Sequence, residues 1–201
     1  METIITIDIE TTAVRVIAFD LKGKQVAARK GTYPTFHTKP DYSEQDPEQV
    51  FITVLFVLKG LLNDPVFMKK NKVLSIVFSS SMHSVLPVDK NGVPLGNAII
   101  WADNRASKVA TELKNSALGI EIYRATGTPI HPMSPLAKIT WIKNHDPERF
   151  AKTSKFISLK EYILHQFTGD YLIDYSLASA TGLFNIHDLK WEQKSLNFAG
   201  I

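Results

Sequence analysis

The stretch that most constrains the fold is residues 4–20, IITIDIETTAVRVIAFD, which predicts two β-strands joined by a short polar turn. An apolar run that begins at Ile4 ends at Asp8, two threonines turn the chain, and a second apolar run ends at Asp20. A carboxylate at a strand end, next to hydroxyl groups and turn amides, suits a phosphate that carries a metal ion. A solvated aspartate beside ordinary turn threonines explains this segment equally well when it is taken alone.

The next segments extend this hairpin into a mixed α/β sheet. Residues 25–32 predict a third strand, so the first three strands form an antiparallel meander. A helix is expected over residues 47–63, because Asp46 suits the N-cap and Pro47 the first helical position. The apolar run 72–79 alternates little and predicts a strand buried on both faces of the sheet. The crossover helix returns this strand parallel to the meander, and helices are expected to flank the sheet.

The rest of the chain is expected to be mainly helical. Short strands are predicted at residues 84–88, 98–101 and 155–157, and helices at 104–115, 121–126, 135–144, 159–167 and 189–201. No repeat, low-complexity segment or linker marks a boundary, so we expect one domain over residues 1–201.

Composition argues against several kinds of partner. A net charge of +3 over 201 residues, without basic clusters interleaved with aromatics, makes nucleic acid a poor candidate. The longest apolar segment is too short to span a membrane, cysteine is absent and no leader is visible, so a cytoplasmic location is expected. The six histidines lack a paired spacing such as HExxH, so a zinc ion held by the protein is not expected.

Six motifs follow one another along almost the whole chain. They are DIETTAVR at 8–15, YSEQDP at 42–47, SSSMHS at 79–84, AIIWADNR at 98–105, GTPIHPMSPLAKITWI at 127–142 and LKEYILHQFTGDYLIDYSLASATGLFNI at 159–186. In this order they resemble the FGGY carbohydrate kinases. The resemblance implies a ribonuclease H-like fold of the actin and hexokinase-type ATPases. The residues of these motifs are most similar to those of the bacterial gluconate kinase branch.

The resemblance implies a function. It is the ATP-dependent phosphorylation of a sugar acid, D-gluconate to 6-phosphogluconate, with ATP and Mg²⁺ as cofactors. This chain would supply the N-terminal, sugar-binding part, and a C-terminal ATP domain would be missing from it; a homodimer is compatible with this. The family's general base is an aspartate expected beyond residue 201, so the chain alone is expected to bind sugar weakly and to leave ATP intact.

Two alternatives to a gluconate kinase stay open. The first is a kinase for a pentulose or polyol, such as xylulose, ribulose or glycerol. The second, from another class, is a non-catalytic sugar-sensing or actin-like scaffold protein with a decayed phosphate loop.

The first motif is implied to handle the nucleotide. By resemblance, phosphate and Mg²⁺ would be contacted by Asp8, Thr11, Thr12 and Arg15, with Asp8 beside the metal. The chain departs from the family pattern at Glu10, where glycine is usual, and at Ala13, where a hydroxyl residue is usual. A glutamate about 5 Å from a phosphate charge would meet a repulsion of roughly 3 kcal/mol at an effective dielectric constant near 20. We therefore expect Glu10 to point outward.

The later motifs are implied to bind the sugar. The residues are Met82, His83, Trp101, Asp103, Arg105, His131 and Met133. Arg105 is a candidate partner for a substrate carboxylate and equally a structural partner of Asp103. Free amides at the start of the helix at 135–144 are further candidates, although that segment also suits a rigid connector. Segment 174–182 is expected to be chiefly architectural, and Glu44 and Gln45 to serve as helix-capping and wall residues.

Overall fold

The computed structural model describes all residues from 1 to 201 and divides into two compact units. Unit 1 consists of residues 1–35 and 46–81, and unit 2 consists of residues 36–45 and 82–201. Each unit has its own sheet or helix framework. No helix in either unit combines the length and the apolar character needed to cross a membrane.

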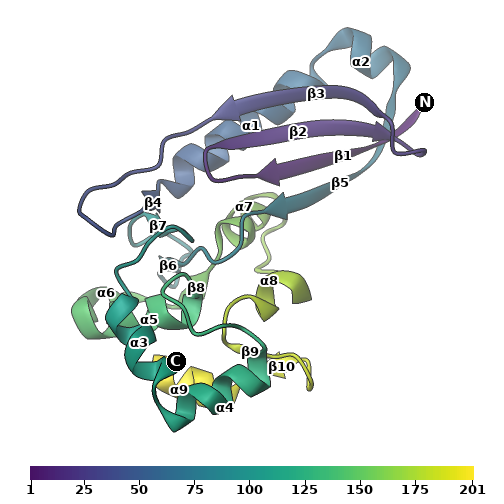
Figure 1. Cartoon of the computed structure of the whole chain (residues 1–201). Coiled ribbons are helices and arrows are strands. Elements are labelled where there is room, and N and C mark those ends of the chain that lie inside the picture. The colour runs from purple at the N-terminus through teal and green to yellow at the C-terminus, as the bar shows by residue number, and fades with distance from the viewer. The chain divides into compact units, whose positions relative to one another are not determined.

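Unit 1 is built on a mixed four-stranded sheet. Its strands are β1 (Glu2–Ile9), β2 (Ala13–Asp20), β3 (Gln25–Thr32) and β5 (Lys72–Ser80), in the order β3-β2-β1-β5 (Figure 1). The first three strands pair antiparallel, and β5 pairs parallel with β1. The predicted meander and parallel return strand are confirmed.

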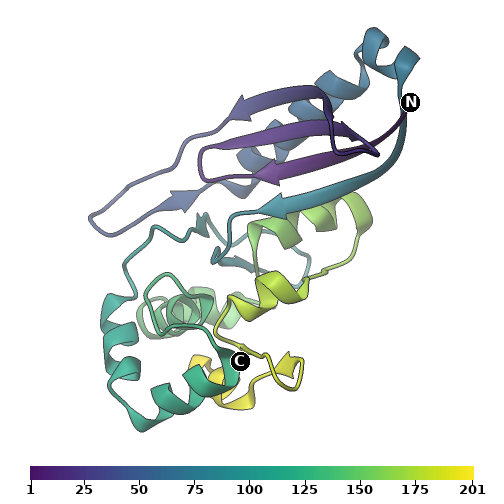
Figure 2. The same cartoon turned by 45° about the vertical axis from the view of Figure 1, so that its right-hand side comes forward.

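Helix α1 (Pro47–Leu62) covers one face of this sheet. Figures 1 and 2 both show it lying along β2 and β3. Asp46 caps it, because its side chain accepts hydrogen bonds from the backbone N–H groups of Glu48 and Gln49. The same Asp-Pro signal, at Asp64, starts the short helix α2 (Pro65–Lys70), which the sequence analysis did not predict.

Strand β5 contradicts the prediction of a strand buried on both faces. It is the edge strand of the sheet, and Leu74, Ile76 and Val77 are 46%, 40% and 51% exposed. A run of apolar residues with little alternation is typical of a covered strand. Here β5 has a strand neighbour on one side only, and these three apolar side chains are exposed.

Unit 2 joins short strand pairs to a helical framework. Its strands are β4 (Glu44–Gln45), β6 (Leu86–Val88), β7 (Ala98–Ile99), β8 (Lys155–Ile157), β9 (Phe184–Asn185) and β10 (Lys190–Trp191). Its helices are α3 (Ser107–Lys114), α4 (Ala117–Thr126), α5 (Pro135–His145), α6 (Pro147–Lys152), α7 (Leu159–Thr168), α8 (Tyr175–Ser179) and α9 (Gln193–Ala199). Three antiparallel pairs form: β4 with β7, β6 with β8, and β9 with β10.

Helix α5 forms the centre of unit 2. Leu136, Ile139 and Ile142 are at most 2% exposed and pack in one cluster with residues of the surrounding strands and helices. The predicted helix at 189–201 is shorter than expected, because the first residues of that range form β10 and only Gln193–Ala199 are helical.

Candidate functional site

In unit 1, the loop between β1 and β2 is held from one side by Tyr33. The hydroxyl group of Tyr33 contacts the carbonyl oxygens of Glu10 and Ala13, and its backbone N–H donates to the carbonyl oxygen of Thr12 at 3.2 Å. Burial, together with the carboxylates of Glu10 and Asp8, raises the pKa of Tyr33, so the hydroxyl keeps its proton. Because the C=O and N–H of a trans peptide point in opposite directions, the N–H groups of Thr11 and Ala13 face away from Tyr33, whereas that of Glu10 donates to the carbonyl oxygen of Ala13. N–H groups that face one way suit an anion.

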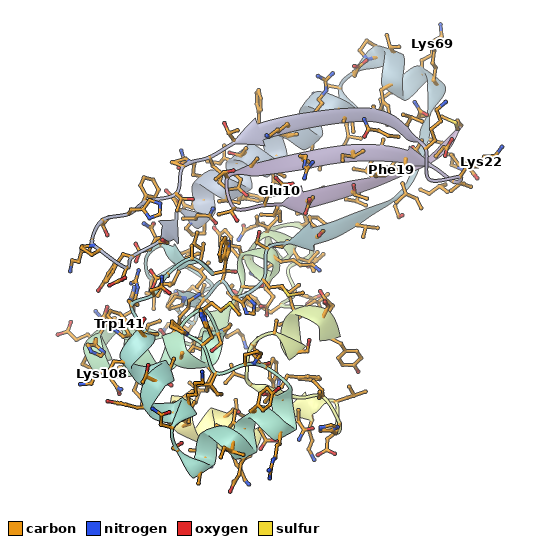
Figure 3. All side chains as sticks on the ribbon, in the orientation of Figure 1. Glu10, Phe19, Lys22, Lys69, Lys108 and Trp141 are labelled. Atoms are coloured by element: carbon orange, nitrogen blue, oxygen red, sulfur yellow. The ribbon has the colours of Figure 1, made fainter.

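Arg15 lies between two carboxylates at this loop. It is opposite Asp8 in the β1–β2 register, with Nη2 3.9 Å from Asp8 Oδ2, and it forms an ion pair with Glu10. Glu10, which we expected to point outward, has a side chain 31% exposed, and its carboxylate faces Arg15. Glu10 does not have a positive φ, so it adopts this turn without the strain that favours glycine. Figure 3 shows Glu10 at one end of the sheet and Lys22 at the other.

The acidic loop fits a metal-bound phosphate better than a free metal ion. No group of three or more His, Cys, Asp or Glu side chains is placed to hold a cation by itself. Asp8 has a side chain 36% exposed. Mg²⁺ is commonly held by one or two carboxylates together with phosphate oxygens and water. Asp8, with the N–H groups of the loop beside it and Thr11 and Thr12 in the loop, matches that donor set.

In unit 2, two of the motifs are brought side by side. Val85 and Ile99 exchange two backbone hydrogen bonds of 2.9 Å in an antiparallel bridge. Met82 and His83 precede Val85, and Trp101 follows Ile99, so these residues lie at the same end of the antiparallel bridge. Met82 and Trp101 are 38% and 47% exposed, so both present apolar surface at the same end of the bridge.

The ring of His83 is fixed in one orientation. Its Nδ1 lies 2.9 Å from the carbonyl oxygen of Ala180, which can only accept, so Nδ1 carries the proton and donates. Burial lowers the pKa of His83, and the nearby charge of Lys138 lowers it further. The neutral ring therefore offers Nε2 as an acceptor for a hydroxyl group. Its backbone has φ +68°, which is uncommon for any residue except glycine.

His131 has the opposite proton arrangement. Its Nδ1 accepts the backbone N–H of Met133 at 3.1 Å, so its neutral ring carries a proton on Nε2. His131 is exposed and Met133 is half-buried. An acceptor on His83 and a donor on His131 together suit a ligand rich in hydroxyl groups.

Asp103 and Arg105 are engaged with the protein itself. Asp103 is fully buried, and its carboxylate accepts from Nε and Nη2 of Arg105 at 2.8 and 2.7 Å and from the backbone N–H of Ser43 at 2.7 Å. Arg105 Nη2 also donates to Glu44 at 2.6 Å, and only 2% of the Arg105 side chain is exposed. Burial opposes the charge of Arg105, but the two carboxylates raise its pKa overall. In this structure neither Asp103 nor Arg105 is open to a ligand, and of the two readings of Arg105 the geometry supports the structural one. Glu44, expected to be a capping and wall residue, is the second partner of this ion pair.

The first two residues of α5 do not offer the free amides that the sequence suggested. Pro135 has no N–H, and the N–H of Leu136 donates to the carbonyl oxygen of Thr181 at 3.0 Å. The segment at 174–182 thus supports both α5 and His83. This is consistent with its expected architectural part.

Lys138 and Tyr33, which hold the two candidate regions, were not among the residues predicted from the sequence. Lys138 is fully buried on α5, and Tyr33 is 5% exposed. The signal for Lys138 is a lysine set among the apolar residues of LAKITWI. Tyr33 leaves no comparable signal, because its contacts span 20 residues or more along the chain.

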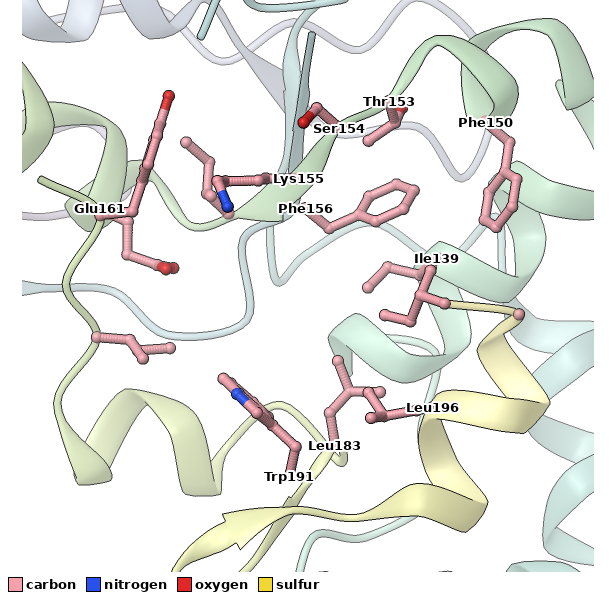
Figure 4. A pocket seen from close by; sticks show the side chains of 15 residues that line it. Ile139, Phe150, Thr153, Ser154, Lys155, Phe156, Glu161, Leu183, Trp191 and Leu196 are labelled. Atoms are coloured by element: carbon pink, nitrogen blue, oxygen red, sulfur yellow. The ribbon is translucent and has the colours of Figure 1, made fainter. Parts of the chain in front are cut away.

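A cavity of about 760 Å³ lies in unit 2 (Figure 4). Apolar side chains make up most of its wall, including Phe150, Phe156 and Trp191. Glu161 also lines it, and burial raises the pKa of that carboxyl group. None of the residues that the sequence predicts for sugar or phosphate lines this cavity.

Comparison with known proteins gives these sites a context. Residues 3–201 match the family model for the N-terminal domain of the FGGY family of carbohydrate kinases. The chain is 42% identical over 195 residues to the gluconokinase of Bacillus subtilis (strain 168), and the match covers 97% of this chain and 37% of that protein. It is 32% identical over 198 residues to the xylulose kinase of Staphylococcus xylosus, covering 98% of this chain and 40% of that protein.

A solved structure agrees with these relatives. The gluconate kinase from Lactobacillus acidophilus superposes with a TM-score of 0.93 at 36% identity, covering 100% of this chain and 40% of that one. The chain thus spans about two fifths of the length of the proteins it matches. The predicted actin- and hexokinase-like fold class is confirmed by such neighbours. The chain belongs to the FGGY family of carbohydrate kinases.

Proposed function

We propose that the protein containing this chain transfers the γ-phosphoryl group of ATP to a hydroxyl group of D-gluconate, giving 6-phosphogluconate. The observation that carries this proposal is the 42% identity to a gluconokinase over 97% of the chain. The paired histidines of unit 2 support it, because their ring nitrogens offer one acceptor and one donor to a polyhydroxylated ligand.

Each residue of unit 2 has a distinct part in this proposal. His83 Nε2 accepts a hydrogen bond from a sugar hydroxyl group, while Nδ1 remains tied to Ala180. His131 Nε2–H donates to the substrate carboxylate or to a second hydroxyl group. Trp101 and Met82 cover the carbon face of the sugar chain. Asp103 and Arg105 are excluded from direct contact and instead hold the Trp101 segment in place.

In unit 1, Asp8, the β1–β2 loop and Arg15 are proposed to orient the phosphate groups. ATP brings Mg²⁺, which neutralises charge on the phosphate groups when it is bound. Asp8 would face that metal, and the loop N–H groups would face phosphate oxygens. When the nucleotide binds, Arg15 would give up its ion pair with Glu10 and bind a phosphate oxygen in its place. A C-terminal ATP domain, a general base beyond residue 201, a homodimer and a cytoplasmic location remain predictions.

A second candidate substrate is xylulose. The xylulose kinase of Staphylococcus xylosus is 32% identical over 98% of this chain. Xylulose has no carboxylate, so the two candidates differ in the group that meets His131.

Steady-state assays of the full-length protein test both candidates. With ATP and Mg²⁺ in excess, ADP release is measured with gluconate, xylulose and glycerol as separate substrates. We expect kcat/KM for gluconate to exceed the others by about tenfold or more, which corresponds to about 1.4 kcal/mol. A larger value for xylulose would establish the second candidate, and no ADP release with any of the three would reject both.

The isolated 201 residues give a complementary test. We expect a small thermal shift with gluconate and no ADP release, because the base is expected outside this chain. Phosphorylation of gluconate by these residues alone would show that the base is within them.

A further inference from the structure

Lys138 is a buried cation without a carboxylate partner of its own. It lies on α5 and is fully buried. An ammonium group taken out of water costs several kcal/mol unless it is well hydrogen-bonded. Its two hydrogen-bond acceptors are backbone carbonyl groups, the oxygens of His83 and Ile100, each 2.7 Å from Nζ.

These two carbonyl groups belong to the two segments proposed to contact the sugar. Ile100 directly precedes Trp101, and His83 directly follows Met82. One ammonium group therefore bridges both segments from the side of α5. It acts just beyond the Val85–Ile99 bridge, where the two segments are no longer joined by backbone hydrogen bonds to each other.

The hydrogen bond from Lys138 matters most at His83, because the backbone there is strained. A non-glycine residue with φ +68° is strained and persists only where its surroundings hold it. Two contacts do so here: Lys138 binds the His83 carbonyl oxygen, and Ala180 accepts from the ring. The first fixes the peptide that follows His83, and the second fixes the imidazole.

The charged groups around Lys138 do not take the place of its two hydrogen bonds to carbonyl oxygens. Burial lowers the pKa of Lys138 to about 7, Asp103 raises it and Arg105 lowers it. Asp103 is itself committed to Arg105 and to the N–H of Ser43. A neutral amine keeps two N–H donors, so both carbonyl bonds persist in either protonation state, although the charged form makes them stronger.

We propose that Lys138 is a positioning residue that sets the backbone of His83 relative to that of Trp101 and thereby determines how tightly the sugar binds. This inference rests on the sugar site proposed above. Lys138 itself does not touch the substrate.

The test compares three variants of the full-length protein. Lys138→Met keeps much of the side-chain volume and removes the donors, whereas Lys138→Arg keeps a charged donor of different shape. Thr140→Val is the matched control, because Thr140 is a buried residue of the same helix whose hydroxyl group bonds only to Leu136 within α5. We expect Lys138→Met to raise KM for gluconate about tenfold with kcat within about threefold, Lys138→Arg to raise it less, and Thr140→Val to leave it unchanged.

A second measurement does not depend on the substrate. The ¹⁵N chemical shifts of the His83 ring report which nitrogen carries the proton, and His83→Asn identifies the signal. We expect the Nδ1–H form in the unsubstituted protein and a mixture of both tautomers in Lys138→Met. If the full-length protein phosphorylates none of the sugars tested, the proposed function fails, but the tautomer measurement still tests Lys138.

The inference is overturned if Lys138→Met folds with both KM and the His83 tautomer unchanged. If Lys138→Met does not fold, Lys138→Arg is the test. An increase in the KM of Lys138→Arg without a matching loss of kcat supports the inference, and an unchanged KM rejects it.

Discussion

The guanidinium carbon of Arg105 lies 3.6 Å from the centre of the Tyr42 ring, and the two residues are 63 positions apart in the sequence. The same guanidinium group is bound to Asp103 and Glu44. The stack and the ion pairs together tie the segment before α1 to the segment that carries Trp101. Arg105 therefore contributes to the candidate site by holding its backbone.

This relationship predicts the effect of Arg105→Lys. A lysine keeps the charge but loses the planar fork and the stack, so we expect the free energy of unfolding to fall by about 2–4 kcal/mol. Urea unfolding measures this loss. Arg149→Lys is the control, because the Asp146 partner of Arg149 is 40% exposed and its ion pair should contribute less than about 1 kcal/mol. A tenfold rise in KM for gluconate with unchanged stability would instead indicate that Arg105 binds substrate.

The proton on His83 predicts a pH dependence. Burial lowers its pKa below the ordinary value, so the ring is neutral at pH 7 and above and its Nε2 accepts a hydroxyl proton. As the pH falls through the pKa of His83, Nε2 becomes protonated and the acceptor is lost. We expect KM for the sugar to be constant between pH 7 and 8 and to rise by up to about tenfold per pH unit below that pKa.

The control for this dependence is His83→Asn. Asparagine tolerates the left-handed backbone and does not titrate. We expect its KM to be about three- to tenfold higher at pH 7, the effect of one hydrogen bond, and nearly independent of pH. A pH profile that stays the same in His83→Asn would assign the titration to another group.

The ion pair between Glu10 and Arg15 predicts that Glu10 weakens nucleotide binding. Glu10→Gln removes a negative charge near the phosphate position and releases Arg15. The side chains of this cluster are 31% to 51% exposed, so solvent screening reduces the effect to about 1 kcal/mol, or about a fivefold lower KM for ATP.

Glu2→Gln is the matched control for Glu10→Gln, because Glu2 begins β1 at the end far from the loop that carries Glu10. We expect no change in KM for ATP from this substitution. A higher KM for ATP in Glu10→Gln would show that Glu10 assists the nucleotide. Absence of ATP turnover in both variants and in the unsubstituted protein would favour the scaffold alternative.

Gly119 predicts a stability effect opposite to helix propensity. Alanine in place of glycine within a helix normally stabilises by about 1 kcal/mol. At Gly119, in α4, an added Cβ would overlap the backbone carbonyl oxygen of Leu113, which cannot move aside easily. We expect Gly119→Ala to lower the melting temperature. Gly60→Ala, in α1, is the control, because its nearest neighbour is the flexible side chain of Arg29 at 3.4 Å, and we expect it to be neutral or stabilising.

The local signals of the sequence predicted the regular elements of unit 1 well. The period of apolar residues predicted β1 and β2. The Asp46-Pro47 pair predicted the N-cap and the first residue of α1. The same signal at Asp64 was overlooked because α2 has only six residues. The burial of β5 was predicted wrongly. Apolar composition shows which side chains favour burial, but it does not show whether a neighbouring element buries them.

The candidate site was less predictable, because its key contacts connect distant parts of the chain. Resemblance placed His83 and Trp101 in one site, but the antiparallel bridge that brings them together is a tertiary feature. Lys138 was missed because lysine is rarely fully buried. The choice between the two readings of Arg105 depended on Glu44, which is 61 residues away.

The open edge of β5 also affects how these residues behave during production. A long apolar strand with unpaired N–H and C=O groups is a template for pairing with another copy, and KVLSIVFSS contains no proline to prevent it. A segment that covered this edge in the full-length protein would also protect it from aggregation. A preparation restricted to these 201 residues should therefore precipitate as its concentration rises, and a lysine in place of Val77 should keep it dispersed.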